Sequence, residues 1–155
     1  MATEIERKYL VRDDSWRAQA RAEVRYRQGY LANTEQCSVR VRIGGGKAFV
    51  NIKGATVGAS RLEFEYPVSL DDARVMLSEL CLPTLVEKTR YLVPHGDRQW
   101  EVDVFEGDNA GLVVAEIELE DAAETVSLPP WVGEEVTDDV RYYNSNLAMT
   151  PFNRW

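Results

Sequence analysis

The sequence predicts an α+β fold that is mainly β, built from antiparallel strands with a few short helices. Two observations predict it. Short segments in which apolar and polar residues alternate follow one another along the chain, separated by frequent turn signals. The polar positions of these segments hold almost only Arg, Lys, Glu and Asp. The alternation indicates antiparallel strands, and the charges raise the question of which way the polar faces point.

Turn residues divide the chain into eight candidate strands. Gly44-Gly45-Gly46 separates two of them as a hairpin turn, and further turns are expected at 94–97 and 107–109, where Gly, Pro, Asp and Asn gather. The predicted strands cover residues 3–12, 23–32, 37–43, 47–53, 61–69, 85–94, 99–105 and 112–120.

Helices are expected at four places. Residues 13–21 follow Asp13-Asp14, and residues 71–80 begin with Asp71 or Asp72 as the cap and carry apolar residues at helical spacing. Two further short helices are predicted near 121–127 and through 140–148. No repeat and no linker rich in Pro, Gly or Ser divides the chain, so we expect a single domain over residues 1–155.

One face of each predicted strand is charged while the other is apolar. In the first strand Glu4, Glu6 and Lys8 alternate with Ile5 and Arg7, because successive side chains of a strand point to opposite faces. The same alternation groups the cations Arg40, Arg42, Lys53, Arg61, Lys88 and Arg90, and the anions Glu63, Glu65, Glu101, Asp103, Glu116, Glu118 and Glu120.

Two interpretations of these faces remain open at this point. In the first, they are the solvated side of an ordinary antiparallel sheet, with salt bridges between neighbouring strands. In the second, the sheet closes into a barrel with the charges inside and the apolar faces packed outward against helices. A barrel with room for a ligand needs about eight strands. The strand count and the near absence of uncharged polar residues favour the barrel.

A converging set of such side chains suits phosphoryl chemistry. The planar fork of arginine matches pairs of phosphate oxygens, so many cations suggest a ligand with several linked phosphates. Grouped carboxylates cannot bind phosphate directly but do bind Mg²⁺ or Mn²⁺, which bridge to phosphate oxygens. Together they indicate a site that positions phosphates, neutralises their charge and orients a water.

Composition and missing motifs exclude other classes. The 155 residues carry a net charge of −8, which argues against nucleic acid as a partner. No apolar run approaches the ~18 residues of a membrane span, and the N-terminus lacks a signal peptide, so we expect a soluble, cytoplasmic protein. Cys37 and Cys81 have no metal-like spacing, His95 is the only histidine, and no Walker-type loop is present.

The residues resemble the CYTH superfamily, also called triphosphate tunnel metalloenzymes. Glu4-x-Glu6-x-Lys8 is similar to its N-terminal signature, and the resemblance continues in order along the whole chain. The matching segments are MATEIERKYL (1–10), RQGYL (27–31), SVRVRI (38–43), NIKG (51–54), SRLEFEY (60–66), VEKTRY (86–91), WEVDVFEG (100–107), VAEIELE (114–120) and GEEVTDDVRYYNSNLA (133–148).

The resemblance implies an eight-stranded antiparallel β-barrel that forms a tunnel, with a C-terminal helix through Tyr142 and Asn146 plugging one end. It implies a basic wall that contacts the phosphates: Lys8, Arg40, Arg42, Lys53, Arg61, Lys88 and Arg90. It implies that the metal ligands are Glu4, Glu6, Glu63, Asp103, Glu116 and Glu118. Lys8 and Tyr30 resemble a dyad tied to tripolyphosphate preference. The residues predicted to be catalytic are Glu4, Glu6, Lys8, Tyr30 and Lys88.

The function implied is a Mg²⁺- or Mn²⁺-dependent inorganic triphosphatase that hydrolyses tripolyphosphate to pyrophosphate and phosphate. Its partner would be a small-molecule triphosphate, with neither nucleic acid nor a membrane involved. Three alternatives remain: a class IV-like adenylyl cyclase, a triphosphatase for nucleoside or thiamine triphosphates, and a non-catalytic module that binds polyphosphate or nucleotides. A homodimer is implied by the resemblance only.

Overall fold

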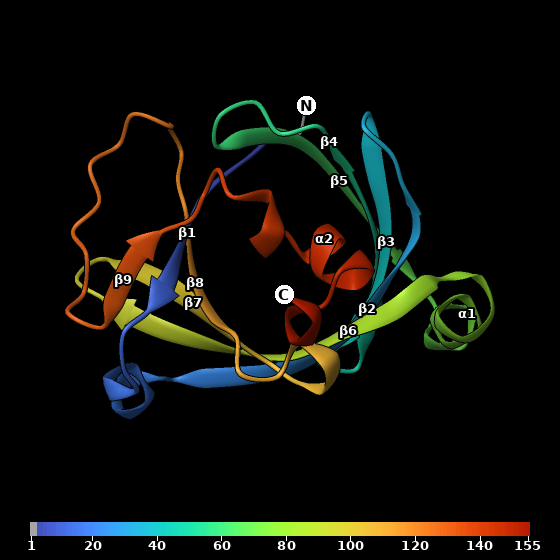
Figure 1. The fold of residues 1–155 in the computed structure, drawn as a ribbon, viewed down its shortest axis with the longest axis horizontal. Coiled ribbons are helices and arrows are strands. Elements are labelled where there is room, and N and C mark those ends of the chain that lie inside the picture. The colour runs from blue at the N-terminus through green and yellow to red at the C-terminus, as the bar shows by residue number, and fades with distance from the viewer. Residues whose placement is uncertain (1–2) are drawn as a thin grey trace.

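The computed structural model describes residues 3–155 as a closed barrel of eight antiparallel strands (Figure 1). Neighbouring strands follow the order β5-β4-β3-β2-β6-β7-β8-β1, and pairing of β1 with β5 closes the ring. The elements are β1 (Thr3–Val11), η1 (Ser15–Gln19), β2 (Ala22–Asn33), β3 (Cys37–Gly44), β4 (Lys47–Gly54), β5 (Ser60–Val68), α1 (Leu70–Val75), η2 (Met76–Leu80), β6 (Leu82–His95), β7 (Arg98–Phe105), η3 (Gly107–Asn109), β8 (Val113–Glu118), β9 (Val132–Glu135), η4 (Val140–Tyr142), α2 (Asn144–Met149) and η5 (Phe152–Arg154).

The eight strands predicted from alternation are confirmed, with small differences at their ends. The largest is at β6, which was expected from residue 85 and begins at Leu82. The sequence prediction missed β9, a four-residue strand that pairs with the end of β1 outside the ring. A strand this short carries too little alternation to stand out, and it is held by its pairing with Tyr9 and Val11.

The prediction of a helix near 121–127 is wrong. The carboxylate of Glu124 accepts hydrogen bonds from the backbone N–H groups of Glu120 and Asp121, and Asp121 accepts one from Ala123. Such local side-chain bonds compete with helical bonds and stabilise a turn. Residues 121–127 therefore form turns and irregular chain.

The other expected helices are present in altered form. Residues 15–19 form a 3₁₀ helix, and the segment expected at 71–80 is an α-helix that continues into π-helical η2. Its cap is Ser69, whose hydroxyl accepts the N–H of Asp72, rather than Asp71 or Asp72. The segment expected at 140–148 divides into η4 and α2.

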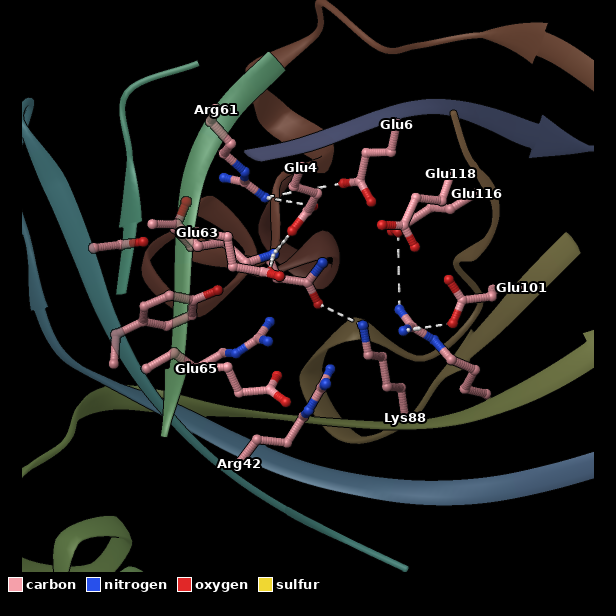
Figure 2. Close-up of a pocket in the computed structure, with 17 residues that line it drawn as sticks. Glu4, Glu6, Arg42, Arg61, Glu63, Glu65, Lys88, Glu101, Glu116 and Glu118 are labelled. Atoms are coloured by element: carbon pink, nitrogen blue, oxygen red, sulfur yellow. Dashed lines mark hydrogen bonds and ion pairs between the residues drawn. The ribbon is translucent and has the colours of Figure 1, made fainter. Parts of the chain in front are cut away.

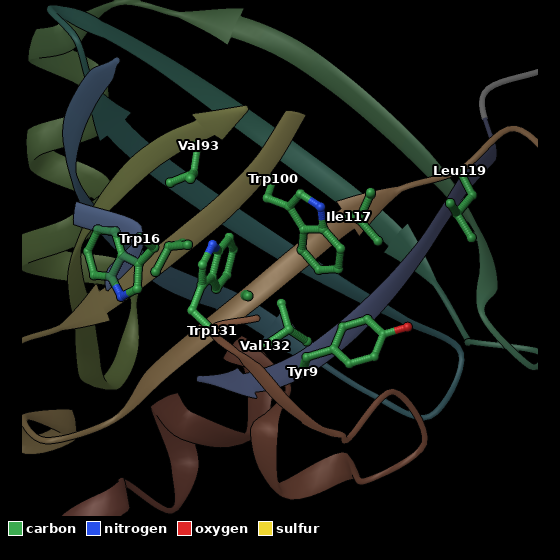
Figure 3. Close-up of a cluster of buried hydrophobic side chains, with 10 residues drawn as sticks. Tyr9, Trp16, Val93, Trp100, Ile117, Leu119, Trp131 and Val132 are labelled. Atoms are coloured by element: carbon green, nitrogen blue, oxygen red, sulfur yellow. The ribbon is translucent and has the colours of Figure 1, made fainter. Parts of the chain in front are cut away.

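The apolar faces of the strands point outward, and other elements cover most of them, whereas Leu62, Phe64 and Tyr66 on the outer face of β5 stay exposed. The larger outer cluster lies over β6, β7, β8 and β1, where Trp100 packs between Tyr9 and Trp131 at centroid distances of 5.5 and 5.7 Å (Figure 3). The fully buried Trp16 of η1 belongs to the same cluster. A smaller outer cluster forms beneath α1 and η2, around Val41 and Leu77. The interior of the barrel is thereby left to the other face of each strand.

One end of the interior is filled by the C-terminal segment. Figure 1 shows α2 inside the ring of strands. Leu147 and Ala148 of α2 are fully buried and pack with Tyr30, Val86 and Phe105 from the inner wall. The plug helix is confirmed. None of the helices within residues 3–155 has the length and apolar character that crossing a membrane requires.

Candidate functional site

A cavity of about 180 Å³ occupies the interior of the barrel, and all eight strands of the ring contribute side chains to its wall (Figure 2). Every second residue of each strand points inward. On these strands the inward residues are the charged or polar ones, so the wall is almost entirely charged or polar. Its lining residues are Glu4, Glu6, Tyr30, Ser38, Arg40, Arg42, Lys53, Arg61, Glu63, Glu65, Lys88, Arg90, Glu101, Glu116, Glu118, Asn144 and Ser145.

Strand register brings distant parts of the sequence together across this wall. Glu4 of β1 lies opposite Arg61 of β5, because β1 begins on that side of the barrel. Further along β1, Glu6 lies opposite Glu118 and Lys8 opposite Glu116. The first strand therefore joins the two sides of the site.

Two of the predicted site residues are not in the cavity wall. Lys8 lines a small adjoining hollow together with Glu6 and Arg61. Asp103 is fully buried behind Lys88 and Arg90. All the other residues predicted to bind metal or phosphate, together with Tyr30, line the cavity.

Asp103 neutralises two cations at once. Lys88 Nζ lies 2.7 Å from Asp103 Oδ2, and Arg90 binds both carboxylate oxygens through Nε at 2.8 Å and Nη2 at 2.9 Å. Burial raises the pKa of Asp103, but Arg90 and Lys88 outweigh burial and hold it below its ordinary value. Burial lowers the pKa of Lys88 to about 8, with Asp103 opposing that shift. That Asp103 is also a metal ligand stays a prediction.

On the opposite side, Lys53 joins two glutamates. Its Nζ lies 2.9 Å from Glu4 Oε2 and 3.2 Å from Glu63 Oε2, and Arg61 approaches Glu4 at 3.8 Å. Burial raises the pKa of Glu4, but a hydrogen bond with Glu63 and the charges of Lys53 and Arg61 hold it low. The same hydrogen bond raises the pKa of Glu63. The carboxyl group of Glu4 therefore stays ionised to a lower pH than that of Glu63.

A second pair of carboxyl groups meets at Glu6 and Glu116. Burial raises the pKa of Glu6 well above its ordinary value, and the charges of Glu116 and Glu4 raise it further. Burial also acts on Glu116, but Lys8 at 3.6 Å and Arg90 at 3.8 Å hold its pKa low. Negative charge at Glu6 is therefore incompletely compensated by the protein.

The arginines of β3 form a basic wall beside these acids. The guanidinium of Arg42 lies 4.1 Å from the ring centroid of Tyr26, and burial together with Arg40 lowers the pKa of Arg42 to about 10. Arg40 Nε is buried and has no hydrogen-bond partner among residues 3–155. The Arg40 guanidinium thus retains donor capacity that no carboxylate takes up.

The predicted pairing of Lys8 with Tyr30 has no hydrogen bond within the described chain. Lys8 Nζ instead donates to the carbonyl oxygen of Tyr142 at 3.2 Å and lies 5.4 Å from the Tyr143 ring centroid. Tyr30 is buried against the plug. The catalytic role of this pair stays a prediction.

Five of the lining residues were not among the predicted ligands or catalytic residues. Glu65 and Glu101 were placed on the charged faces of their strands, and the period-2 signal could have extended the predicted site to them. Ser38 shares the inward face of β3 with the arginines but carries no charge to mark it. Asn144 and Ser145 gave no signal, because they reach the cavity from the plug segment.

The acidic residues of the wall suit a hard divalent cation. Two carboxyl pairs, Glu6 with Glu116 and Glu4 with Glu63, hold negative charge at close range, and an oxygen-seeking cation would relieve the repulsion at Glu6. Within residues 3–155, no three carboxylate, imidazole or thiol groups converge as closely as the ligands of one ion do. Lys53 and Arg61 occupy part of the acidic set through ion pairs.

The fold and this site define a class of protein: a closed antiparallel barrel whose charged interior combines a basic wall with clustered carboxylates. The chain belongs to the CYTH family, since the CYTH domain model matches residues 2–146. The family resemblance drawn from the sequence segments is thereby confirmed.

Two relatives share nearly the full length of the chain. The inorganic triphosphatase of Acetivibrio thermocellus is 43% identical, covering 100% of this chain and 99% of its own. The inorganic triphosphatase of Nitrosomonas europaea is 41% identical, covering 96% of this chain and 98% of its own.

Solved structures agree with this assignment. The crystal structure of the inorganic triphosphatase NE1496 is 38% identical, with a TM-score of 0.69 and 96% of both chains covered. The PH1012 protein of Pyrococcus horikoshii has a TM-score of 0.59 at 16% identity, covering 77% of this chain and 80% of that chain. At that identity the second match shows the fold alone.

Proposed function

We propose that this protein is a divalent-metal-dependent inorganic triphosphatase, which hydrolyses tripolyphosphate to pyrophosphate and phosphate. The observation that carries the proposal is that arginines, lysines and clustered carboxylates line one small cavity inside the barrel. The full-length similarity to two inorganic triphosphatases supports it. The site needs both the cations and the carboxylates, because cations alone bind phosphate without providing for its hydrolysis.

The basic side chains would bind and neutralise the linked phosphates. Arg40 and Arg42 offer planar donors from β3, and Lys88 and Arg90 offer donors from β6. Because Asp103 anchors Lys88 and Arg90, these two cations hold fixed positions before the substrate arrives. Such preorganised charge is the usual source of rate in phosphoryl transfer. Lys8, Lys53 and Arg61 complete the proposed basic set.

The carboxylates would serve the metal and the attacking water. Glu4, Glu6, Glu63, Glu116 and Glu118 are the residues that would hold Mg²⁺ or Mn²⁺. When bound, the ion would polarise phosphoryl oxygens and lower the pKa of water. Among these ligands, Glu6 has a pKa raised well above its ordinary value in the metal-free protein, so its negative charge is the one that a bound cation would compensate most.

The lining favours an inorganic triphosphate over a nucleotide. Among the residues of the described chain that line the cavity, Tyr30 is the one aromatic side chain, and it is buried against the plug. A nucleobase site needs stacking surface that this wall does not offer. The adenylyl cyclase alternative therefore has less support than hydrolysis of tripolyphosphate.

One comparative assay tests the proposal. Purified protein is given tripolyphosphate, ATP, GTP and thiamine triphosphate at equal concentration, with Mg²⁺ and with Mn²⁺, and the products are separated. Phosphate and pyrophosphate released from tripolyphosphate at the highest rate is the expected result. Cyclic AMP from ATP would favour the cyclase, and tight binding with no product from any substrate would favour a binding module.

A further inference from the structure

Asn144, the first residue of α2, occupies an unusual position in the charged wall. Its Oδ1 accepts two hydrogen bonds, from Lys88 Nζ at 3.0 Å and from Gln28 Nε2 at 3.1 Å. Both donors come from the barrel, whereas Asn144 comes from the plug. The amide thus ties the plug to the wall at the cavity itself.

These two bonds determine which way the amide faces. A lysine ammonium can only donate hydrogen bonds, so the oxygen of Asn144 has to point toward Lys88. The amide nitrogen, Nδ2, is then left on the other branch of the side chain. Within residues 3–155 it donates to no protein acceptor, and Asn144 lines the cavity.

The segment that carries Asn144 is firmly held. Leu147 and Ala148 of the same helix are fully buried, and the carbonyl oxygen of Tyr142 accepts a hydrogen bond from Lys8. Gln28, which bonds to Asn144 Oδ1, is itself fully buried. A side chain anchored on both sides loses little freedom when it binds a ligand.

From this geometry we propose that Asn144 binds the substrate, its Nδ2 donating a hydrogen bond to a phosphoryl oxygen of the triphosphate. The inference rests on the proposed function for the class of substrate. Lys88, Lys53 and Arg90 are each shared with a carboxylate. Asn144 Nδ2 has no such competitor among the described residues, so it is available without breaking an ion pair.

Two variants of Asn144 separate this role from the simple positioning of Lys88. Asn144→Asp keeps an acceptor for Lys88 but removes the donor. Asn144→Leu removes both groups at similar volume and adds no charge. Asn146→Asp is the matched control, since Asn146 lies two residues on in the same helix and its amide faces the carbonyl of Arg141 at 3.5 Å.

The readouts are the affinity of the metal-free protein for tripolyphosphate, by calorimetry in EDTA, and the separate values of kcat and KM with Mg²⁺. A donor to a charged oxygen is worth about a 10- to 100-fold change in binding. We expect both Asn144 variants to bind tripolyphosphate that much more weakly, and Asn146→Asp to bind as the wild type does.

Wild-type affinity in Asn144→Asp would overturn the proposal, because the residue would then act only on Lys88. Weakening in Asn144→Asp but not in Asn144→Leu would overturn it too, since repulsion by the new charge would explain the loss. Thermal melting checks that each variant folds, and Asn144→Ala, which also removes both groups without adding a charge, replaces Asn144→Leu if that variant does not fold. The calorimetric comparison remains decisive even if the wild type turns over no tripolyphosphate, a result that would reject the proposed function separately.

Discussion

Two groups of charged residues lie inside the same barrel but are neutralised in opposite ways. In the compensated cluster (Lys88, Arg90 and Asp103), the central carboxylate has a cation on each of its oxygens. In the carboxyl cluster (Glu6 and Glu116), burial and the neighbouring charge of Glu116 raise the pKa of Glu6. The difference teaches that the protein neutralises the carboxylate of one cluster with its own cations and leaves negative charge in the other for a ligand to neutralise.

Removing the charge of Asp103 should have the largest effect on stability. In Asp103→Asn the buried Lys88 and the partly buried Arg90 lose their common partner, and breaking a buried pair in this way costs roughly 3–5 kcal/mol. Urea unfolding in EDTA measures the free energy of unfolding. An unchanged midpoint and slope would show that the compensated cluster does not hold the barrel together.

Removing a charge from the carboxyl cluster should instead affect catalysis. We expect Glu6→Gln to lower tripolyphosphate hydrolysis about 100-fold or more. Glu6 is a proposed ligand of the metal, and the bound metal contributes several kcal/mol of charge stabilisation to the reaction. The metal-free variant should remain folded by circular dichroism. Glu120→Gln, an exposed glutamate just beyond β8, is the control and should retain activity. Equal activity of both variants would contradict the assignment of Glu6.

The pH dependence of stability separates the clusters further. Since the folded-state pKa of Glu6 is raised above 4.5, its contribution to stability is complete below that pH and is lost as pH rises through the raised value. Metal-free wild type should therefore lose stability relative to Glu6→Gln as pH rises, by at most about 1.4 kcal/mol per pH unit.

Denaturant titrations at a series of pH values, in EDTA, give this difference directly. Adding Mg²⁺ should reduce it, because a bound cation would compensate the ionised Glu6. A difference between variant and wild type that stayed constant with pH would count against the raised pKa.

The smallest effect on stability and hydrolysis is expected at an exposed ion pair that is as short as the pair of Lys88 with Asp103. Asp139 Oδ2 lies 2.7 Å from Arg141 Nη2, the distance found between Asp103 and Lys88, but Arg141 is exposed. Solvent screens such pairs, so Asp139→Asn should leave stability and hydrolysis nearly unchanged. A loss comparable to that of Asp103→Asn would mean that burial does not explain the contrast between these two pairs.

Most of the wall was predictable because it is carried by strands. Glu4, Lys53 and Glu116 lie far apart in the sequence, yet each follows the same alternation of charged and apolar residues. Asn144 could not be predicted in this way, since it enters from a six-residue helix whose position depends on burial of Leu147 and Ala148. The helix predicted near 121–127 does not form for a local reason, because backbone N–H groups donate hydrogen bonds to the carboxylate of Glu124.

The sequence by itself determined the strands, the side chains that share each face and, through its ordered motifs, the family. Tertiary structure decided which face is inside. Period-2 alternation is the same for an open sheet and a closed barrel, and only pairing of Thr3–Ile5 with Ser60–Leu62 closes the ring. It also decided how each charge is compensated, because ion pairs such as Lys53 with Glu4 depend on distances between strands that are remote in the chain.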